Sequence, residues 1–183
     1  GLYGLERVSS IKQQDYAMMM EGYMDVLSTV SYGFDTSIAP LGTALTREQV
    51  RLLKRYTDNV ILSFDSDNAG QMAAERAIFL LKEESFNIRV LQLHGAKDPD
   101  EFLKKFGREA FLKEVQECLE AFDFLYAYYK KEYSLDDVIA KQKFIERFQE
   151  FFQSLSKELE QELYLQKFSD LLGMDIQVLR PLL

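Results

Sequence analysis

Residues 59–67 have the sequence Asn59-Val60-Ile61-Leu62-Ser63-Phe64-Asp65-Ser66-Asp67, a short apolar run that ends in two carboxylates. Similar runs occupy residues 17–20 and 88–93, and a weaker one occupies residues 37–39. Runs of this length with β-branched residues are typical of strands buried on both faces. Helical patterns lie between them, at residues 23–32, 46–56 and 69–84. The alternation predicts an α/β domain with a mostly parallel sheet and right-handed crossovers.

The second half of the chain has a different pattern, with no clear strand after Asp100. Apolar residues recur there at helical spacing in three stripes: Phe111, Val115, Leu119, Phe122 and Tyr126; Phe144, Phe148, Phe151, Phe152 and Leu155; Leu163, Phe168, Leu171 and Leu172. Such stripes are typical of the packed faces of a helical bundle, which we favour over a base-stacking surface. Cys118 falls within the first stripe and is expected to be a small buried hydrophobe.

Composition excludes several classes of protein. The chain has 183 residues, 47% of them apolar, which argues against disorder. One Cys and one His supply neither a disulfide framework nor a cysteine-rich zinc site. The net charge of −8 argues against a protein that simply coats nucleic acid. No stretch approaches the roughly 18 apolar residues of a membrane span, and no signal peptide is visible, so we expect a cytoplasmic protein without a membrane partner.

Carboxylates follow the predicted strands at the point where each strand ends. Asp65 follows the run just quoted, Glu21 follows Met20, and Asp98 lies just beyond residue 93. Ligands of open parallel sheets bind outside the carboxyl ends of the strands. The sequence therefore predicts one acidic cluster at that sheet edge, made of Glu21, Asp25, Asp65, Asp67, Asp98 and Asp100.

Crowded carboxylates repel one another, and a bound divalent cation removes that cost. Oxygen ligands without His or Cys favour a hard ion, Mg²⁺ or Mn²⁺, and such sites suit phosphoryl or nucleotidyl transfer. Each segment alone has a simpler explanation, because residues 65–68 can cap the next helix and Asp98-Pro99-Asp100 can form a turn. It is much less expected that three acidic segments lie at one sheet edge only because each forms a cap or a turn.

A few other residues are candidates for substrate binding. Lys97 either meets a phosphate or pairs with a neighbouring acid. Gly42 and Thr43 lie at a strand-to-helix turn whose N–H groups suit a phosphate, although turn geometry alone explains Gly42 equally well. Lys54 and Arg55 lie late in a helix, where complementing the helix dipole is favoured over contact with nucleic acid.

Four stretches closely resemble bacterial replicative DNA primases. They are Met20-Glu21-Gly22-Tyr23-Met24-Asp25-Val26, Leu41-Gly42-Thr43-Ala44-Leu45-Thr46, Phe64-Asp65-Ser66-Asp67-Asn68-Ala69-Gly70 and Lys97-Asp98-Pro99-Asp100-Glu101. Residues 16–103 resemble the Toprim domain, the acidic α/β module that primases share with topoisomerases. Residues 1–15 resemble the tail of the basic subdomain that precedes it, and residues 104–183 resemble the helical bundle that closes the polymerase core.

The resemblance implies a fragment of a DNA-directed RNA polymerase that makes short RNA primers on single-stranded DNA from ribonucleoside triphosphates. It implies that Glu21, Asp65 and Asp67 are the central metal ligands and catalytic residues, with Glu21 either a base or only a ligand. Asp98 and Asp100 would complete the cluster, and Asp25 would support it. It also implies Mg²⁺ or Mn²⁺ as cofactor, no zinc in this fragment, and a bacterial cytoplasmic enzyme associated with the nucleoid and replisome.

The sequence departs from the family pattern in two respects. The family often has Gly where Ser66 stands, and a small polar residue is expected to be tolerated if its φ is negative. Most of the basic subdomain, any zinc-binding module and any carboxy-terminal helicase-binding domain are expected to be absent. The replicative helicase would then contact the full-length protein elsewhere, and the isolated fragment would have little or no activity.

Three other hypotheses stay open. A Toprim-type nuclease or topoisomerase would cleave supercoiled DNA without nucleotides. A phospho-acceptor signalling domain also gathers Asp residues and a Lys at a parallel sheet edge, and acetyl phosphate would label it. A non-catalytic binding module would display an exposed apolar patch on its helices.

Overall fold

The computed structural model describes all 183 residues, which form two compact units. We call Gly1–Ala121 the α/β unit and Phe122–Leu183 the helical unit. None of the helices is both long enough and apolar enough to cross a membrane.

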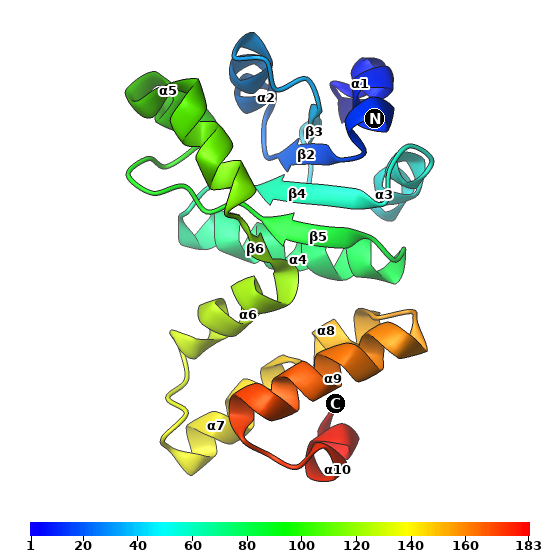
Figure 1. Ribbon diagram of the computed structural model, residues 1–183, viewed down its shortest axis with the longest axis vertical. Coiled ribbons are helices and arrows are strands. Elements are labelled where there is room, and N and C mark those ends of the chain that lie inside the picture. The colour runs from blue at the N-terminus through cyan, green and yellow to red at the C-terminus, as the bar shows by residue number, and fades with distance from the viewer. The chain divides into compact units, whose positions relative to one another are not determined.

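The α/β unit is built on one six-stranded sheet (Figure 1). Its strands are β1 Leu2–Tyr3, β2 Ala17–Met20, β3 Ser37–Pro40, β4 Asn59–Ser63, β5 Asn87–Val90 and β6 Leu119–Glu120. Their order across the sheet is β1-β3-β2-β4-β5-β6. The four central strands are parallel, and only the short edge strands β1 and β6 are antiparallel. The predicted α/β class and mostly parallel sheet are confirmed.

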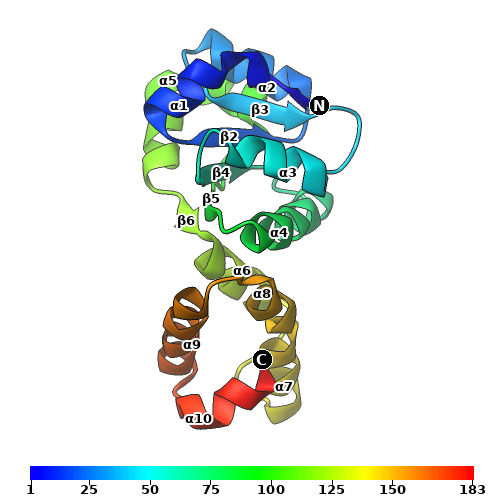
Figure 2. The same cartoon turned by 90° about the vertical axis from the view of Figure 1, so that its right-hand side faces the viewer.

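Helices cover both faces of this sheet. They are η1 Leu5–Arg7, α1 Val8–Gln14, α2 Tyr23–Ser31, α3 Arg47–Lys54, α4 Asn68–Glu83 and α5 Pro99–Gln116. Side chains alternate between the faces of a strand, so Met18 and Met20 pack against α2 and α5. Figure 2 shows α3 and α4 on the side of the sheet away from α2.

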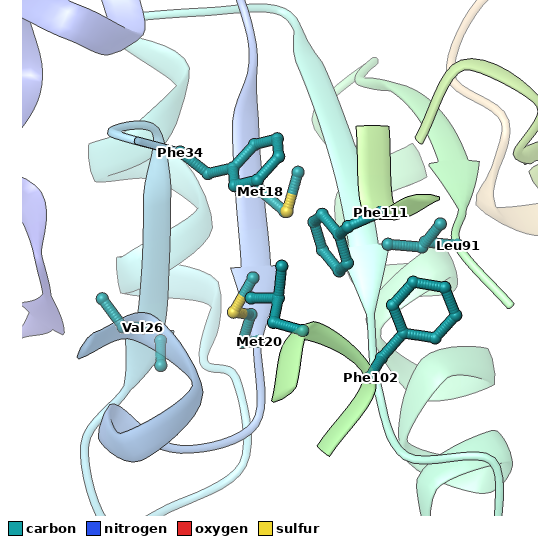
Figure 3. Packing of buried hydrophobic residues seen from close by; sticks show 9 residues of the cluster. Met18, Met20, Val26, Phe34, Leu91, Phe102 and Phe111 are labelled. Atoms are coloured by element: carbon teal, nitrogen blue, oxygen red, sulfur yellow. The ribbon is translucent and has the colours of Figure 1, made fainter. Parts of the chain in front are cut away.

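A compact apolar cluster holds α2 and α5 on their face of the sheet. Figure 3 shows Phe34, Phe102 and Phe111 around Met18 and Met20. The ring centroid of Phe111 lies 4.9 Å from that of Phe34 and 6.0 Å from that of Phe102, both edge to face. This packing fixes α5, and with it the loop that precedes α5, relative to the ends of the strands.

The sequence patterns located these elements well, apart from the sheet edges. The four parallel strands and the helices α2, α3 and α4 lie within one to three residues of their predicted bounds. Thr46 forms a capping box with Gln49 at the start of α3. Strands β1 and β6 were not predicted, because two residues carry no periodicity. The helical prediction for Cys118 and Leu119 is wrong: α5 ends at Gln116, and Leu119 lies in β6.

The helical unit begins at the second residue of α6 Ala121–Lys130. It continues with α7 Val138–Arg147, α8 Gln149–Ser154, α9 Glu158–Leu172, α10 Ile176–Leu179 and η2 Arg180–Leu182. Its centre is aromatic: Phe148 is fully buried, and its ring lies 4.5 Å from that of Phe168 and 5.1 Å from that of Phe122, centroid to centroid. The aromatic residues of the stripes therefore pack in the core, as the sequence favoured. The prediction is wrong for Leu163 and Leu171, which are 63% and 48% exposed. Asp137 caps α7, and Gly173 ends α9 in a left-handed conformation.

The compact units divide at Ala121, whereas the family resemblance placed domain boundaries at residues 15/16 and 103/104. The difference arises because α5 runs on to Gln116 and buries Phe111 in the core of the α/β unit. The predicted boundaries stay predictions about the domain organisation of the family.

Candidate functional site

Strand register brings the first two acidic segments together. Met20 of β2 pairs with Ser63 of β4 in parallel register, so the chain leaves both strands at the same edge. Glu21 is the next residue after β2, and its Oε1 accepts a hydrogen bond from the backbone N–H of Asp65 at 2.6 Å. The two carboxylates therefore share one rim of the sheet, as predicted.

The loop from β4 to α4 depends on a glycine. Asp67 caps α4 by accepting a hydrogen bond from Gly70 N at 2.7 Å. A Cβ atom on Gly70 would lie 2.1 Å from the backbone oxygen of Asp65, so no other residue fits without moving this loop. Ser66 is not among the non-glycine residues with positive φ, which agrees with the expectation that serine is tolerated there.

The loop before α5 lies against the first two segments. Asp98 caps α5 by accepting a hydrogen bond from Glu101 N at 2.8 Å. Glu101 in turn accepts one from Lys97 N at 2.9 Å, which closes the loop on itself. The carbonyl of Lys97 accepts a hydrogen bond from Ser66 N at 3.4 Å, so this loop contacts the β4–α4 loop directly.

The remaining two carboxylates link α2 to α5. Asp25 Oδ1 accepts a hydrogen bond from Asp100 N at 3.4 Å. The Asp100 carboxylate lies 3.0 Å from the ammonium of Lys104, one helical turn further along α5. Asp100 thus has a cationic partner of its own.

The pKa values record the crowding. Burial, followed by repulsion from the negative charge of Asp98, raises the pKa of Asp25 to about 7. Burial also raises the pKa of Asp65 to about 6, followed by repulsion from Glu21 and Asp98. In contrast, the hydrogen bond from Lys104 lowers the pKa of Asp100. The cluster therefore has a core of mutually repelling carboxylates and one flank that is already neutralised.

The chemistry of the donors fits a hard divalent cation, since carboxylate oxygens are the ligands such ions prefer. Glu21, Asp67 and Asp98 each commit one oxygen to a backbone N–H, which fixes the carboxylate and leaves the other oxygen available. No three His, Cys, Asp or Glu side chains are grouped so that they could hold a metal ion between them as they stand. Coordination by three of them therefore requires side-chain rotation within the cluster.

The other candidate residues divide between the two ends of the sheet. Lys97 is close enough to Asp65 for its charge to lower the pKa of that carboxyl. Gly42 and Thr43 are exposed in the β3–α3 loop, and Gly42 has a φ of +67°, which explains the glycine by turn geometry.

Lys54 and Arg55 lie at the opposite end, just before β4 begins, and are not brought together with the carboxylates. Lys54 Nζ pairs with Asp58 at 2.7 Å and donates to the Ser85 carbonyl at 3.2 Å. The structure thus gives Lys54 local partners at the carboxyl end of α3.

Sequence reasoning missed three residues at this edge. Gly70 and Glu101 appear in the sequence analysis only as parts of motifs. Gly70 permits the close approach of backbone in the β4–α4 loop, and Glu101 closes the loop before α5. Arg76 of α4 is not among the residues that the sequence predicts for the site. It lines a groove of about 380 Å³ together with Glu21 and Thr43. A helical Arg among alanines has no distinctive spacing, so only the topology reveals its proximity to the carboxylates.

Two family models match the chain. Residues 18–103 match a family described as Toprim-like. Residues 122–177 match the DnaB-helicase binding domain of primase. The second match corrects the expectation that a helicase-binding domain is absent here, since a model of that description covers most of the helical unit. The aromatic periodicity of this region indicated only a bundle and carried no sign of a partner.

Curated relatives support the same family along the full length. The DNA primase of Clostridium acetobutylicum is 36% identical over 182 residues, which cover 100% of this chain and 30% of the relative. That of Listeria innocua is 35% identical over 178 residues, covering 96% of this chain and 28% of the relative. The chain thus spans about a third of the length of the curated relatives it matches.

Solved structures agree with the fold. A DNA primase domain from Pseudomonas aeruginosa has a TM-score of 0.86 at 25% identity, with 99% of this chain and 58% of that chain covered. The Aquifex aeolicus primase, comprising zinc-binding and RNA polymerase domains, has a TM-score of 0.83 at 30% identity, with 98% and 43% covered. A primase catalytic domain bound to single-stranded DNA also matches, with a TM-score of 0.83 at 27% identity.

These matches cover both compact units, and the range of the Toprim-like match contains the acidic residues at the sheet edge. The chain belongs to the bacterial DNA primase family, of which it represents the Toprim-like domain and the helical region that follows it.

Proposed function

We propose that this chain supplies the metal-binding part of a primase catalytic core, which makes RNA primers on single-stranded DNA from ribonucleoside triphosphates. The observation that carries the proposal is the set of carboxylates on three neighbouring loops at one sheet edge, two of them with pKa values raised to about 7 and about 6. A structural role alone does not account for carboxylates held where they repel one another.

The cofactor we propose is Mg²⁺, with Mn²⁺ as substitute and no zinc in this segment. Glu21, Asp65 and Asp67 would be the central ligands, supported by Asp98, Asp100 and Asp25. Mg²⁺ commonly binds through one or two carboxylates plus substrate phosphates, which suits a site where few side chains converge. Zinc prefers nitrogen and sulfur ligands, and the single His94 and single Cys118 belong to no group that could hold a metal.

The proposed reaction is nucleotidyl transfer. The 3′-hydroxyl of a ribonucleotide attacks the α-phosphorus of an incoming triphosphate, and the bond to the pyrophosphate leaving group breaks. The divalent ion, when bound, lowers the pKa of the attacking hydroxyl and steadies the charge on the leaving group. Glu21 holds one oxygen against Asp65 N and has the other free to ligate the ion or accept the hydroxyl proton. Lys97, beside Asp65, is proposed to meet a phosphate.

The partners follow from this activity and from the matched relatives. We propose that single-stranded DNA is the template, and that the enzyme is cytoplasmic and works at the replisome. We also propose a replicative helicase as a partner, because residues 122–177 match the helicase-binding model. Binding of purified helicase to this 183-residue chain would support the helical unit as the contact. If it does not bind, the contact must lie elsewhere in the longer protein.

Metal binding is the direct test. Titration with Mn²⁺, followed by the electron paramagnetic resonance signal of the free ion, should show binding to this chain. Asp65→Ala should weaken it at least tenfold with unchanged circular dichroism. Asp170→Ala, which removes an exposed carboxylate of the helical unit, is the matched control and should leave Mn²⁺ affinity unchanged. Absence of Mn²⁺ binding by the wild-type chain would contradict the proposal.

Catalysis is tested in the full-length primase that contains this segment. Asp65→Ala there should lower primer synthesis at least a hundredfold, which corresponds to about 2.7 kcal/mol of transition-state stabilisation. Normal priming by that variant would exclude Asp65 from the catalytic site. Cleavage of supercoiled DNA by the chain without nucleotides would instead favour a nuclease or topoisomerase.

A further inference from the structure

A groove beside the carboxylates has no role in the metal site just proposed. It has a volume of about 380 Å³ and is lined by residues of α4 and of the β3–α3 loop. Ala69, Ala73 and Ala77 line it from α4, spaced four residues apart on one stripe of the helix. Their short side chains leave room that larger residues would fill, and Phe64 and Leu45 supply the rest of an apolar floor.

Polar groups occur only at the rim of this groove. Glu21 lies at the end next to the metal-binding edge, and Thr43 lies on the β3–α3 loop. Arg76 is the only cation among the lining residues, is exposed, and makes no hydrogen bond or ion pair within the structure. The other arginines of this face behave differently, since Arg47 pairs with Glu83 and Arg51 pairs with Glu84.

Arg76 belongs to α4, the helix whose N-terminus lies at the metal-binding edge. Eight residues separate it from Asn68 at the start of α4, which is about 12 Å along the helix axis. Helical side chains tilt toward the N-terminus of their helix, and the N-terminus of α4 is at the metal-binding edge. The guanidinium is therefore expected to reach back along the groove toward Glu21.

We propose that this groove holds the base and ribose of a nucleotide whose phosphates lie at the carboxylate edge, and that Arg76 contacts the base. The inference rests on the proposed function, which places a triphosphate and its divalent ion at that edge. A volume of this size is within the range of small-ligand pockets, which are mostly apolar with a few placed polar groups. An apolar floor suits a base and ribose rather than a phosphate, and guanidinium groups hydrogen-bond to base acceptors and stack on base faces.

Nuclear magnetic resonance of the 183-residue chain with ¹³C-labelled alanine methyl groups tests the groove directly. Adding ATP with Mg²⁺ should shift the signals of Ala69, Ala73 and Ala77, and leave that of Ala140 in the helical unit unchanged. Shifts confined to other residues would overturn the proposal.

Two substitutions test the groove by affinity. Arg76→Gln removes the rim cation, and Ala73→Leu fills the floor. Each should weaken ATP binding about tenfold while Mn²⁺ affinity stays at the wild-type value. Arg51→Gln removes an exposed cation from the same side of the sheet, away from the groove, and should change neither. Arg76 is exposed, so its variant should fold even if Ala73→Leu does not.

The outcomes separate this inference from the function on which it rests. If ATP and Mn²⁺ bind but neither substitution affects ATP, the groove proposal fails and the metal site stands. If the wild-type chain binds no Mn²⁺, the proposed function fails, and adenosine without phosphates then tests the groove alone. Adenosine at millimolar concentration should still shift the three groove methyl signals, and no shift would overturn the proposal.

Discussion

In the α/β unit, carboxylates crowd one sheet edge, where burial and then mutual repulsion raise the pKa values of Asp25 and Asp65. In the helical unit, by contrast, charged groups pair with opposite charges around an aromatic core. Asp65 and Asp25 exemplify the first case. In the second, the guanidinium of Arg180 lowers the pKa of Glu162. Lys167 lies 2.8 Å from the carboxylate of Asp123. The carboxylates of the α/β unit therefore carry an electrostatic cost that a bound cation can relieve. The charge pairs of the helical unit carry no such cost and stabilise the fold.

The largest expected effect is in the helical core. Phe148→Ala removes a fully buried ring that contacts several other rings, and should lower the free energy of unfolding by about 3–5 kcal/mol. Urea unfolding followed by circular dichroism measures this. Leu159→Ala, at a side chain that is 72% exposed, is the control and should cost little. Mn²⁺ affinity of the folded variant should equal that of the wild-type chain. A lower affinity would contradict the view that the helical core affects stability but not metal binding.

Gly70→Ala breaks the acidic edge instead. The new Cβ cannot stay 2.1 Å from the Asp65 oxygen, so the loop must move, at a cost of about 1–3 kcal/mol in unfolding free energy. Because the displaced backbone positions Asp65 and Asp67, Mn²⁺ affinity should fall about tenfold. Gly22→Ala is the matched control, since no atom lies within 4 Å of its added Cβ and its φ of −134° suits alanine. Equal effects of the two substitutions would contradict this explanation.

The pH dependence sharpens the comparison. The raised pKa values mean that the folded state keeps protons on Asp25 and Asp65 that the unfolded chain loses above about pH 4. Stability should therefore be greatest at low pH for these groups and fall as pH rises through about 6 to 7. Solvent screening of these partly open carboxyls limits the loss to about 1–2 kcal/mol.

Urea unfolding in EDTA at pH 5 and pH 8 measures this loss. Asp25→Asn should flatten the profile, and Mg²⁺ should restore more stability at pH 8 than at pH 5. The lowered pKa values of Asp100 and Glu162 act only below about pH 4.5, outside this window. If the free energy of unfolding rose from pH 5 to pH 8 without metal, the raised pKa values of Asp25 and Asp65 would be contradicted.

The smallest expected effect is at a helix cap. Asp137 accepts a hydrogen bond from Ala140 N at 2.8 Å, and Asp137→Ala should cost about 1 kcal/mol. A carboxylate of the helical unit should thus affect stability alone, with unchanged Mn²⁺ affinity. Asp136→Ala, next to the cap, should be nearly neutral in the same unfolding assay.

Strand patterns and helix caps are local, which is why the sequence predicted the parallel strands and the cap of α4 within residues 65–68. The acidic cluster was also predictable, because parallel topology sends every strand end to one edge and the strands were found. The roles of Gly70 and Glu101 were not predictable, since they depend on contacts with the backbones of Asp65 and Lys97. Arg76 was not predictable either, since only the fold places it in one groove with the β3–α3 loop. For Lys54 and Arg55 the sequence favoured complementing the helix dipole over contact with nucleic acid, and the local partners of Lys54 agree with that preference.

The two-residue edge strands have a further consequence for how this protein behaves in a crowded solution. An exposed parallel strand would offer a row of unpaired N–H and C=O groups to any neighbouring chain. Strands β1 and β6 cover β3 and β5 with two antiparallel residues each. A neighbouring molecule therefore finds almost no backbone template on either side, and the apolar strands between them are protected from intermolecular β-aggregation.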